Sequence, residues 1–210
     1  MSKQKQHYTL IEVLTVIAII GILAGILFPM VTRSRERAVE NKAVAGANAI
    51  AMALRNYKMA YSKFPGIPIS VSGSGVYTPV GGGDKEFNSL SETDEDDKYD
   101  KIIVALTGVL PGGNSYDDFA TLNKKKTSFL ELPAEYMKDH GFFANPWGRR
   151  YYIVYAKTGA SILKFNSPKS SVELKIGSDV AVFSEMNPTS KEFKEGSRLA
   201  TSWAGVIDIK

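Results

Sequence analysis

The 210-residue sequence has no cysteine and only two histidines, His7 and His140. The lack of cysteine excludes disulfides, thiolate catalysis and cysteine-bound zinc, and two histidines are too few for a multi-histidine metal site. The net charge is also small, because 26 Lys and Arg residues against 22 Asp and Glu residues leave only +4. With no basic stretch studded with aromatics, this small excess argues against a nucleic-acid partner.

Motifs of catalysis are absent too. The sequence has no glycine-rich phosphate loop, no nucleophile elbow and no acid–base pair around His140. We therefore expect a protein that is not an enzyme, with no catalytic residues, no metal site and no cofactor. Calcium stays open as an alternative, because the run Ser91 to Asp100 is dense in carboxylates. That run lacks the glycine and the terminal Glu of an EF-hand, so a solvated surface loop is the preferred interpretation.

What the sequence has is one long apolar run, from Leu10 to Val31. Its length is the roughly 20 residues that a helix needs to cross a bilayer. An ordinary secretory signal would have a shorter apolar core followed by a small-residue cleavage site, so we expect a retained transmembrane helix. A short tail before the run and a large polar part after it favour a cytoplasmic N-terminus, although the flanking positive charges are nearly balanced.

Two residues inside the apolar run are unusual. Glu12 is its only charged residue. A carboxylate within a span costs roughly 2.5–3.5 kcal/mol, which predicts a partner, the alternative being a side chain that snorkels to the headgroups. Pro29 removes one backbone hydrogen bond and crowds the carbonyl of Gly25, which predicts a kink or local melting of the helix.

The helix is expected to continue well beyond the membrane. Apolar residues recur at spacings of three and four from Val39 to Tyr61, which predicts an amphipathic helix with one buried face. Phe64-Pro65-Gly66 should end it near Ser62. A helix from Thr9 to Ser62 would be about 80 Å long.

The segment His7 to Val13 leads into this run and reads HYTLIEV. It closely resembles the processing signal of type IV pilins and pseudopilins, a short basic leader followed by glycine, an aromatic residue, Thr-Leu-Ile-Glu and an apolar helix. Tyr8 stands where phenylalanine is usual, and His7 stands where glycine is usual. The other motif residues match one for one: Thr9, Leu10, Ile11 and Glu12.

The resemblance implies cleavage by prepilin peptidase between His7 and Tyr8, with methylation of the new amine of Tyr8. In a packed filament, Glu12 of one subunit would meet that amine on another. Opposite charges attract by several kcal/mol at low dielectric, which would offset the cost of burying Glu12. Pilin-like proteins also have a proline at the place of Pro29, so the resemblance assigns both residues to filament assembly.

A second motif lies in the C-terminal part. Asn145-Pro146-Trp147-Gly148 forms a predicted turn before a strand at Arg150 to Ala156. With Tyr151 it resembles the Asp-Pro-Trp-Gly-x-x-Tyr motif of the major pseudopilins of type II secretion, with Asn145 in place of the aspartate. An ordinary Asn-Pro turn beside a buried Trp is the compatible alternative. The calcium loop of that family is not carried over to Ser184–Trp203, where acids alternate with basic residues.

Other segments complete the predicted fold. Residues 66 to about 100 are expected to be loops, and Lys101 to Leu110 a short apolar helix or strand. Further strands are predicted at Ser171–Ile176, Val180–Ser184 and Val206–Ile209. The fold class is therefore α+β, a long N-terminal helix packed on a small antiparallel β-sheet, as in pilins.

The predicted organisation is a leader (1–7), a transmembrane half of the helix (8–31), an amphipathic half (32–63) and a globular periplasmic domain (64–210). The resemblance implies a structural subunit of a pseudopilus or pilus-like filament, drawn from the bacterial inner membrane. Its partners would be copies of itself, related pseudopilins, prepilin peptidase and an inner-membrane assembly platform. The alternative is a membrane-tethered periplasmic binding module that never polymerises.

Overall fold

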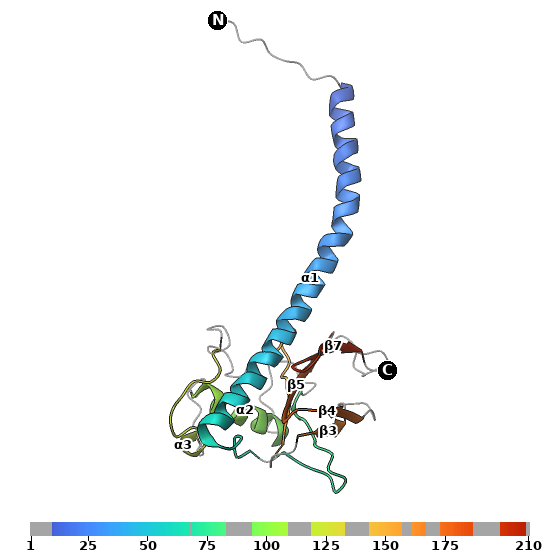
Figure 1. Cartoon of the computed structure of the whole chain (residues 1–210). Coiled ribbons are helices and arrows are strands. Elements are labelled where there is room, and N and C mark those ends of the chain that lie inside the picture. Colours follow the sequence, from blue (N-terminus) through green and yellow to red (C-terminus); the bar gives the residue numbers. More distant parts are fainter. Residues whose placement is uncertain are drawn as a thin grey trace, which may run out of the picture. The chain divides into compact units, whose positions relative to one another are not determined.

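The computed structural model describes residues 10–67, 69–82, 94–108, 119–132, 143–156, 161–166, 173–186 and 198–208 (Figure 1). The chain divides into two units, Met1–Val39 and Glu40–Lys210, and each is described by itself. The helices are α1 (Leu10–Tyr61), α2 (Asp94–Thr107) and α3 (Phe119–Leu122). The strands are β1 (Val80–Gly81), β2 (Tyr152–Tyr155), β3 (Leu163–Asn166), β4 (Glu173–Ile176), β5 (Val180–Glu185), β6 (Arg198–Thr201) and β7 (Gly205–Asp208).

The long helix α1 has 52 residues, close to the extent predicted from the sequence. It runs without a break through Pro29, so the local melting expected there does not occur. It ends at Tyr61, and Ser62 has a φ of 57°, in the left-handed region that stops a right-handed helix. The predicted end near Ser62 is therefore confirmed.

The outer part of α1 buries most of the predicted stripe, although Val39 at its start is exposed and Tyr61 at its end is only partly buried. Five of its apolar residues are fully or almost fully buried: Ala43, Ala47, Ile50, Leu54 and Tyr57. Gly46 lies on the same face, and a Cβ there would come within 2.1 Å of the Tyr151 hydroxyl. Since Tyr151 is itself buried and donates to the carbonyl of Ala43 at 3.2 Å, this crossing of helix and strand requires glycine.

A five-stranded antiparallel sheet has the order β1-β2-β5-β6-β7, and β3 pairs with β4 in a separate two-stranded sheet. In the central pair, Tyr152 lies opposite Phe183 and Tyr155 opposite Val180. Successive residues of β2 point to opposite faces, and all four are buried, so both faces of the sheet are covered.

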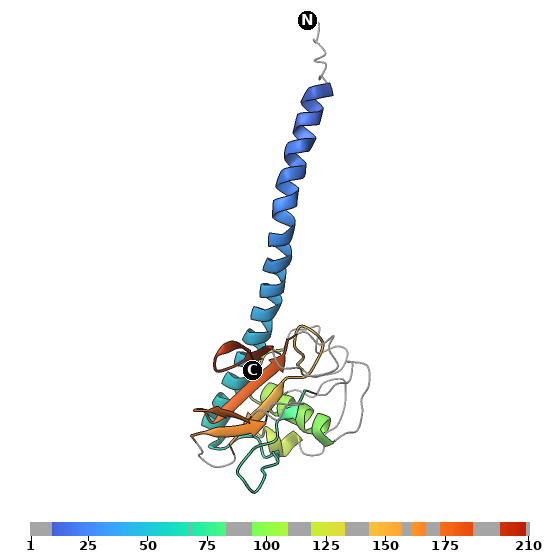
Figure 2. The same cartoon turned by 90° about the vertical axis from the view of Figure 1, so that its right-hand side faces the viewer.

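The two faces carry separate hydrophobic cores. On one face, Ile153 and Tyr155 pack in a core with α1 and α2. On the other, Val154 and Phe183 pack in a core with the β3–β4 pair. Figure 1 shows this layering, with α1 and α2 on one side of β5 and the β3–β4 pair on the other. Figure 2 turns this part of the chain by 90°.

Helix α2 corrects one expectation. The run Ser91 to Asp100 was expected to be a loop, but α2 begins at Asp94. Its largest buried side chains are spaced as one helical face: Tyr99, Ile102, Ile103 and Leu106. Val104, Ala105 and Thr107 are buried as well, so the last turns of α2 are covered on every side. Acidic residues in a first helical turn are also favoured by the helix dipole, so the composition that suggested a loop is compatible with a helix start. The segment Lys101–Leu110, predicted as helix or strand, is helical to Thr107.

Strand predictions succeeded for the apolar segments. The predicted strands at Arg150–Ala156, Ser171–Ile176, Val180–Ser184 and Val206–Ile209 correspond to β2, β4, β5 and β7. Strands β1, β3 and β6 were not predicted. The α+β class is confirmed.

Buried tyrosine hydroxyls tie the loops to this core. Tyr155 donates to the carbonyls of Pro65 and Ile67, both at 3.1 Å, and Tyr99 donates to the carbonyl of Phe143. Burial raises the pKa of Tyr57 to about 12, with the neighbouring Tyr61 adding to the shift. Burial also raises the pKa of Tyr99 and of Tyr155 well above the usual range. These hydroxyls therefore stay neutral donors at physiological pH.

We expect residues 35–210 to form a soluble, folded domain. The truncation keeps all of the unit Glu40–Lys210 and removes the apolar helix half that has no cover of its own. Circular dichroism should show a cooperative thermal transition, and gel filtration should show a mostly monomeric protein. Aggregation despite the intact buried stripe would mean that the boundary between the two halves is misplaced.

Candidate functional site

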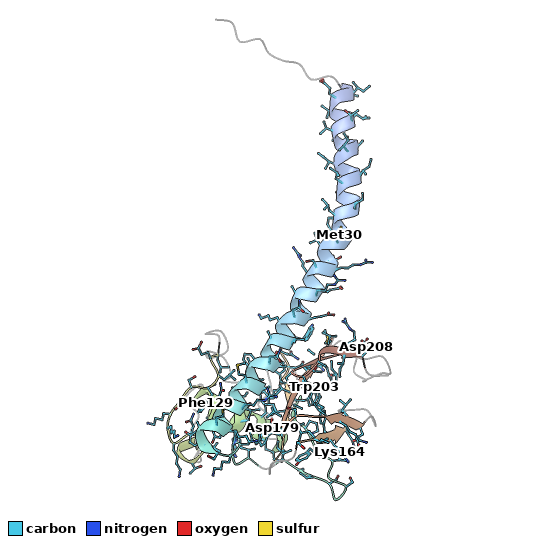
Figure 3. All side chains as sticks on the ribbon, viewed as in Figure 1. Met30, Phe129, Lys164, Asp179, Trp203 and Asp208 are labelled. Atoms are coloured by element: carbon cyan, nitrogen blue, oxygen red, sulfur yellow. The ribbon has the colours of Figure 1, made fainter. Side chains whose placement is uncertain are left out.

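The first half of α1 presents apolar side chains to its surroundings in every direction. Leu10, Ile22 and Phe28 are 83%, 66% and 76% exposed, and the other large apolar residues of this stretch are exposed too. Figure 3 shows these side chains standing out from the ribbon on all sides as far as Met30. Among the described residues, α1 is the one helix long and apolar enough to cross a membrane. This half therefore needs lipid or other helices around it.

Glu12 lies in the first turn of α1. Its backbone carbonyl accepts a hydrogen bond from the Thr15 hydroxyl at 2.9 Å. Leu10 and Ile11 are exposed in the same turn, whereas His7, Tyr8 and Thr9 lie outside the described residues. A carboxylate at a helix N-terminus is favoured by the dipole, but in a hydrocarbon environment it still needs a positive partner.

Pro29 lies within the apolar half, two residues before its end at Val31. The helix is maintained around it, and the Thr32 hydroxyl donates to the carbonyl of Phe28 at 3.4 Å. The role of Pro29 in filament assembly stays a prediction.

The predicted turn at Asn145–Gly148 is present and is organised by the Asn145 side chain. Asn145 is buried, and its Oδ1 accepts from the backbone N–H groups of Trp147 at 3.0 Å and Arg149 at 2.9 Å. Its backbone carbonyl accepts from the N–H of Gly148 at 2.9 Å. Gly148 has a φ of +77°, so glycine suits the left-handed turn position here.

The other end of the Asn145 amide fastens the turn to β5. Its Nδ2 donates to the Ser184 hydroxyl at 2.5 Å. An aspartate at this position could accept the same two backbone hydrogen bonds, but it has no N–H to donate to Ser184. The amide of Asn145 therefore makes a contact that the usual aspartate could not make in the same way. Trp147, expected to be buried, is only half-buried.

A buried ion pair continues this connection. Glu185 accepts from Arg149 at 3.2 Å and from the Tyr152 hydroxyl at 3.1 Å, and its side chain is 10% exposed. The turn motif is therefore a structural clamp that fixes the entry of β2 onto β5.

Two further charged contacts were not found from the sequence. Arg198 on β6 makes a bidentate contact with the carboxylate of Glu40 on α1 and lies 3.4 Å from Asp208 on β7. Asp179 accepts from Lys58 of α1 at 2.7 Å and lies 3.8 Å from Arg55. Both contacts join the outer half of α1 to residues more than 100 positions away, and no local sequence signal marks such pairs.

Among the described residues, no group of three Asp, Glu, His or Cys side chains could hold a metal ion. The acids Glu192 and Glu195 lie outside the described residues, as do the side chains of Asp94–Asp97. Glu185 is already engaged by Arg149 and Tyr152.

The long apolar N-terminal helix and the antiparallel sheet packed against its outer half define a pilin-like α+β fold. Sequence similarity to curated proteins narrows this class further. The chain is 39% identical over 66 residues to type II secretion system core protein G of Aeromonas hydrophila, which covers 31% of this chain and 46% of the relative.

Relatives of the same name occur in Dickeya chrysanthemi, 34% identical over 31% of this chain and 42% of the relative, and in Escherichia coli, 36% identical over 30% and 43%. The resemblance to type II secretion pseudopilins is thus shown by sequence similarity, although the matched part spans less than half the length of these relatives. No family model and no solved structure matches the chain significantly.

Replacing Asn145 by Ala should destabilise the domain by about 2–4 kcal/mol, because two partly buried N–H groups lose their acceptor and the buried Ser184 hydroxyl loses its donor. Asn145→Asp should cost less, since both turn acceptors remain. Urea unfolding of residues 35–210 gives the comparison, with Asn48→Ala on the exposed face of α1 as the control. A loss at Asn145→Ala no greater than at Asn48→Ala would contradict the clamp.

Proposed function

We propose that this chain is a structural subunit of a pseudopilus or type IV pilus-like filament that supports type II protein secretion. The observation that carries the proposal is the exposed first half of α1, whose side chains are apolar on every face with Glu12 as the one charged residue described there, and which continues into the helix that packs in the core of a folded domain. The similarity to core protein G of type II secretion supports the same conclusion.

In this proposal, residues 1–7 are a leader on the cytoplasmic side of the bacterial inner membrane, and residues 8–31 cross that membrane. Residues 32–63 and the domain 64–210 lie in the periplasm. Prepilin peptidase removes the leader, and an inner-membrane platform draws the subunits from the bilayer into a helical filament with related pseudopilins. The chain has a mechanical role and no catalytic one, and it works without a cofactor.

The sequence of events depends on two charges. Before cleavage the nitrogen of Tyr8 is an uncharged amide, and cleavage turns it into a positive amine beside the apolar helix. That amine pairs with Glu12 of a neighbouring subunit, so only processed chains gain the attraction that offsets the cost of a buried carboxylate.

Processing predicts a mature chain that starts at a methylated Tyr8. Intact-mass spectrometry of membrane-extracted protein, with and without prepilin peptidase, measures this directly. The change His7→Gly restores the usual residue before the cleavage site and should accelerate processing. A chain that still begins at Met1 or Ser2 in a peptidase-positive host would rule the cleavage out.

The second prediction separates a filament subunit from a tethered module. Glu12→Ala removes a carboxylate from the membrane segment, so insertion becomes easier by roughly 2.5–3.5 kcal/mol, or less near the interface. In a filament, however, the amine of Tyr8 loses its partner and stays buried and unpaired. We expect Glu12→Ala protein at normal levels in the membrane and absent from filaments.

The assay is shearing and crosslinking of surface filaments from cells that overproduce the chain with its assembly machinery. Membrane fractionation checks insertion, and Thr15→Ala, one turn further along the same helix, is the matched neutral control. A normal filament yield from Glu12→Ala would refute the assembly role of Glu12, and an absence of filaments from the unaltered chain in the same cells would favour the tethered module.

A further inference from the structure

Three arginines, Arg33, Arg35 and Arg37, follow directly after the apolar half of α1 and are here called the arginine collar. The collar begins three residues after Met30, which Figure 3 labels, and all three arginines are exposed. At about 100° per residue, Arg33 and Arg37 lie on one side of the helix and Arg35 lies on the opposite side. The collar therefore presents guanidinium groups on two opposite sides of one short stretch of helix.

The charge of the collar is largely uncompensated. In the described part of the chain, none of its arginines forms an ion pair. Glu36 is the one acid between Arg33 and Arg37, so three positive charges and one negative charge leave a net charge of +2. The next acid along α1, Glu40, is already engaged by the bidentate contact with Arg198. Guanidinium groups stay charged at physiological pH, so the collar favours an anionic partner from outside the described residues.

The collar lies where the headgroups would be in a bilayer crossed by the apolar half. A hydrocarbon core about 30 Å thick is flanked on each side by a polar layer of about 5–8 Å, which contains the lipid phosphates. With a rise of about 1.5 Å per residue, Arg33, Arg35 and Arg37 begin about 3, 6 and 9 Å beyond Val31 along the helix. Long arginine side chains extend toward polar groups while their stems stay near apolar surface, so all three guanidinium groups can reach this layer.

The residue type suits a phosphate. The planar guanidinium group presents paired N–H donors in a fork that matches two oxygens of a phosphate group. Lysine would supply the same charge at this place without that geometry. Basic residues beside an anionic membrane surface also gain a general electrostatic attraction. Three arginines at headgroup depth therefore combine an attraction to the surface with donors for individual phosphates.

We propose that the arginine collar binds the phosphate groups of anionic phospholipids in the periplasmic leaflet and thereby fixes the depth at which α1 crosses the bilayer. This inference rests on the proposed function in one respect, the crossing of the membrane by residues 8–31. A subunit has to release these phosphates before it enters a filament. The collar thus retains the chain in the bilayer, whereas Glu12 favours its departure.

Solid-state NMR of the full chain tests the contact directly. The protein is labelled with carbon-13 at its guanidinium carbons and reconstituted into bilayers of phosphatidylcholine and phosphatidylglycerol. Dephasing of these carbons by the phosphorus of the lipid then reports close contact. We expect dephasing in the unaltered chain and its loss in Arg33→Gln/Arg35→Gln/Arg37→Gln, because the remaining arginines all belong to the folded unit Glu40–Lys210.

A lipid titration gives the strength of the contact. Native mass spectrometry of the full chain in a neutral detergent, with increasing phosphatidylglycerol, yields a Kd. Each single Arg→Gln change in the collar should raise this Kd about fivefold, and the triple change about a hundredfold, at roughly 1 kcal/mol for each basic residue. The triple Arg→Lys variant should lie between the two extremes, because it retains the charge and loses the fork.

The matched control is Lys42→Gln, which removes an exposed cation of the same helix within the folded unit and should leave the Kd unaltered. A Kd raised as much by Lys42→Gln as by a single change in the collar would overturn the proposal, since any surface cation would then act alike. Absence of dephasing in the inserted, unaltered chain, or dephasing that survives the triple change, would overturn it as well.

These measurements need an inserted chain and no filament, so the two proposals fail separately. Loss of the phosphate contact would leave the proposed filament subunit intact, and a chain that makes this contact without ever polymerising would remove the filament role alone. A full chain that does not insert into bilayers would remove both.

Discussion

The exclusion of water from the first half of α1 is the constraint on which the rest of the molecule depends. Fully burying one Leu or Ile side chain is worth about 1.5–3 kcal/mol, and this stretch exposes more than a dozen large apolar residues. No contact within the folded unit Glu40–Lys210 approaches that total. The first half of α1 therefore determines where the chain resides. The domain must fold without covering that half, so that lipid or other helices can surround it.

The outer half of the same helix is apolar on one face only, and the domain packs against that face. One face is apolar and small enough at Gly46 for Tyr151 to cross it closely, while Glu40, Arg55 and Lys58 fix the flanks through Arg198 and Asp179. The sheet is covered on both faces, so it exposes little apolar surface of its own. Such a domain can remain rigid while the helix half before it changes its surroundings.

The sequence was most informative where the physics is local. The extent of α1 followed from an apolar run, a stripe with helical spacing and a Phe-Pro-Gly stop, and the strands with dense apolar residues followed in the same way. It was least informative where the partner is distant. Arg198 pairs with Glu40, which lies 158 positions earlier in the chain. Strand β6 is defined by its pairing with β5 and β7, and no local pattern marks it in the sequence. The start of α2 was not predicted, because the acidic composition of residues 91–100 is also typical of a loop, whereas the spacing of Tyr99, Ile102 and Leu106 is that of a helix.

The turn at Asn145 shows how far a motif can be interpreted without a structure. The position of the turn and its structural role were predictable, because an Asn-Pro-x-Gly sequence favours a turn before a strand. The reason for an amide at this position was not, since the Ser184 hydroxyl that receives its Nδ2 proton lies 39 residues away on β5. A residue that differs from the motif it resembles can thus be suited to a partner outside that motif.

The apolar character of α1 cannot by itself drive subunits out of a membrane, because lipid tails are as apolar as leucine and neighbouring helices offer no further hydrophobic gain. Helix packing, lipid entropy and polar groups can each contribute to the difference in free energy between bilayer and filament, and in the described part of the apolar half Glu12 is the one ionisable side chain. A carboxylate is costly in lipid and favourable beside a fixed positive charge, so its preference for the filament is opposite in sign to its preference for the bilayer. In the proposed assembly, the carboxylate in the first turn of α1 thus favours departure from the bilayer, while the apolar side chains around it gain no hydrophobic free energy from the transfer.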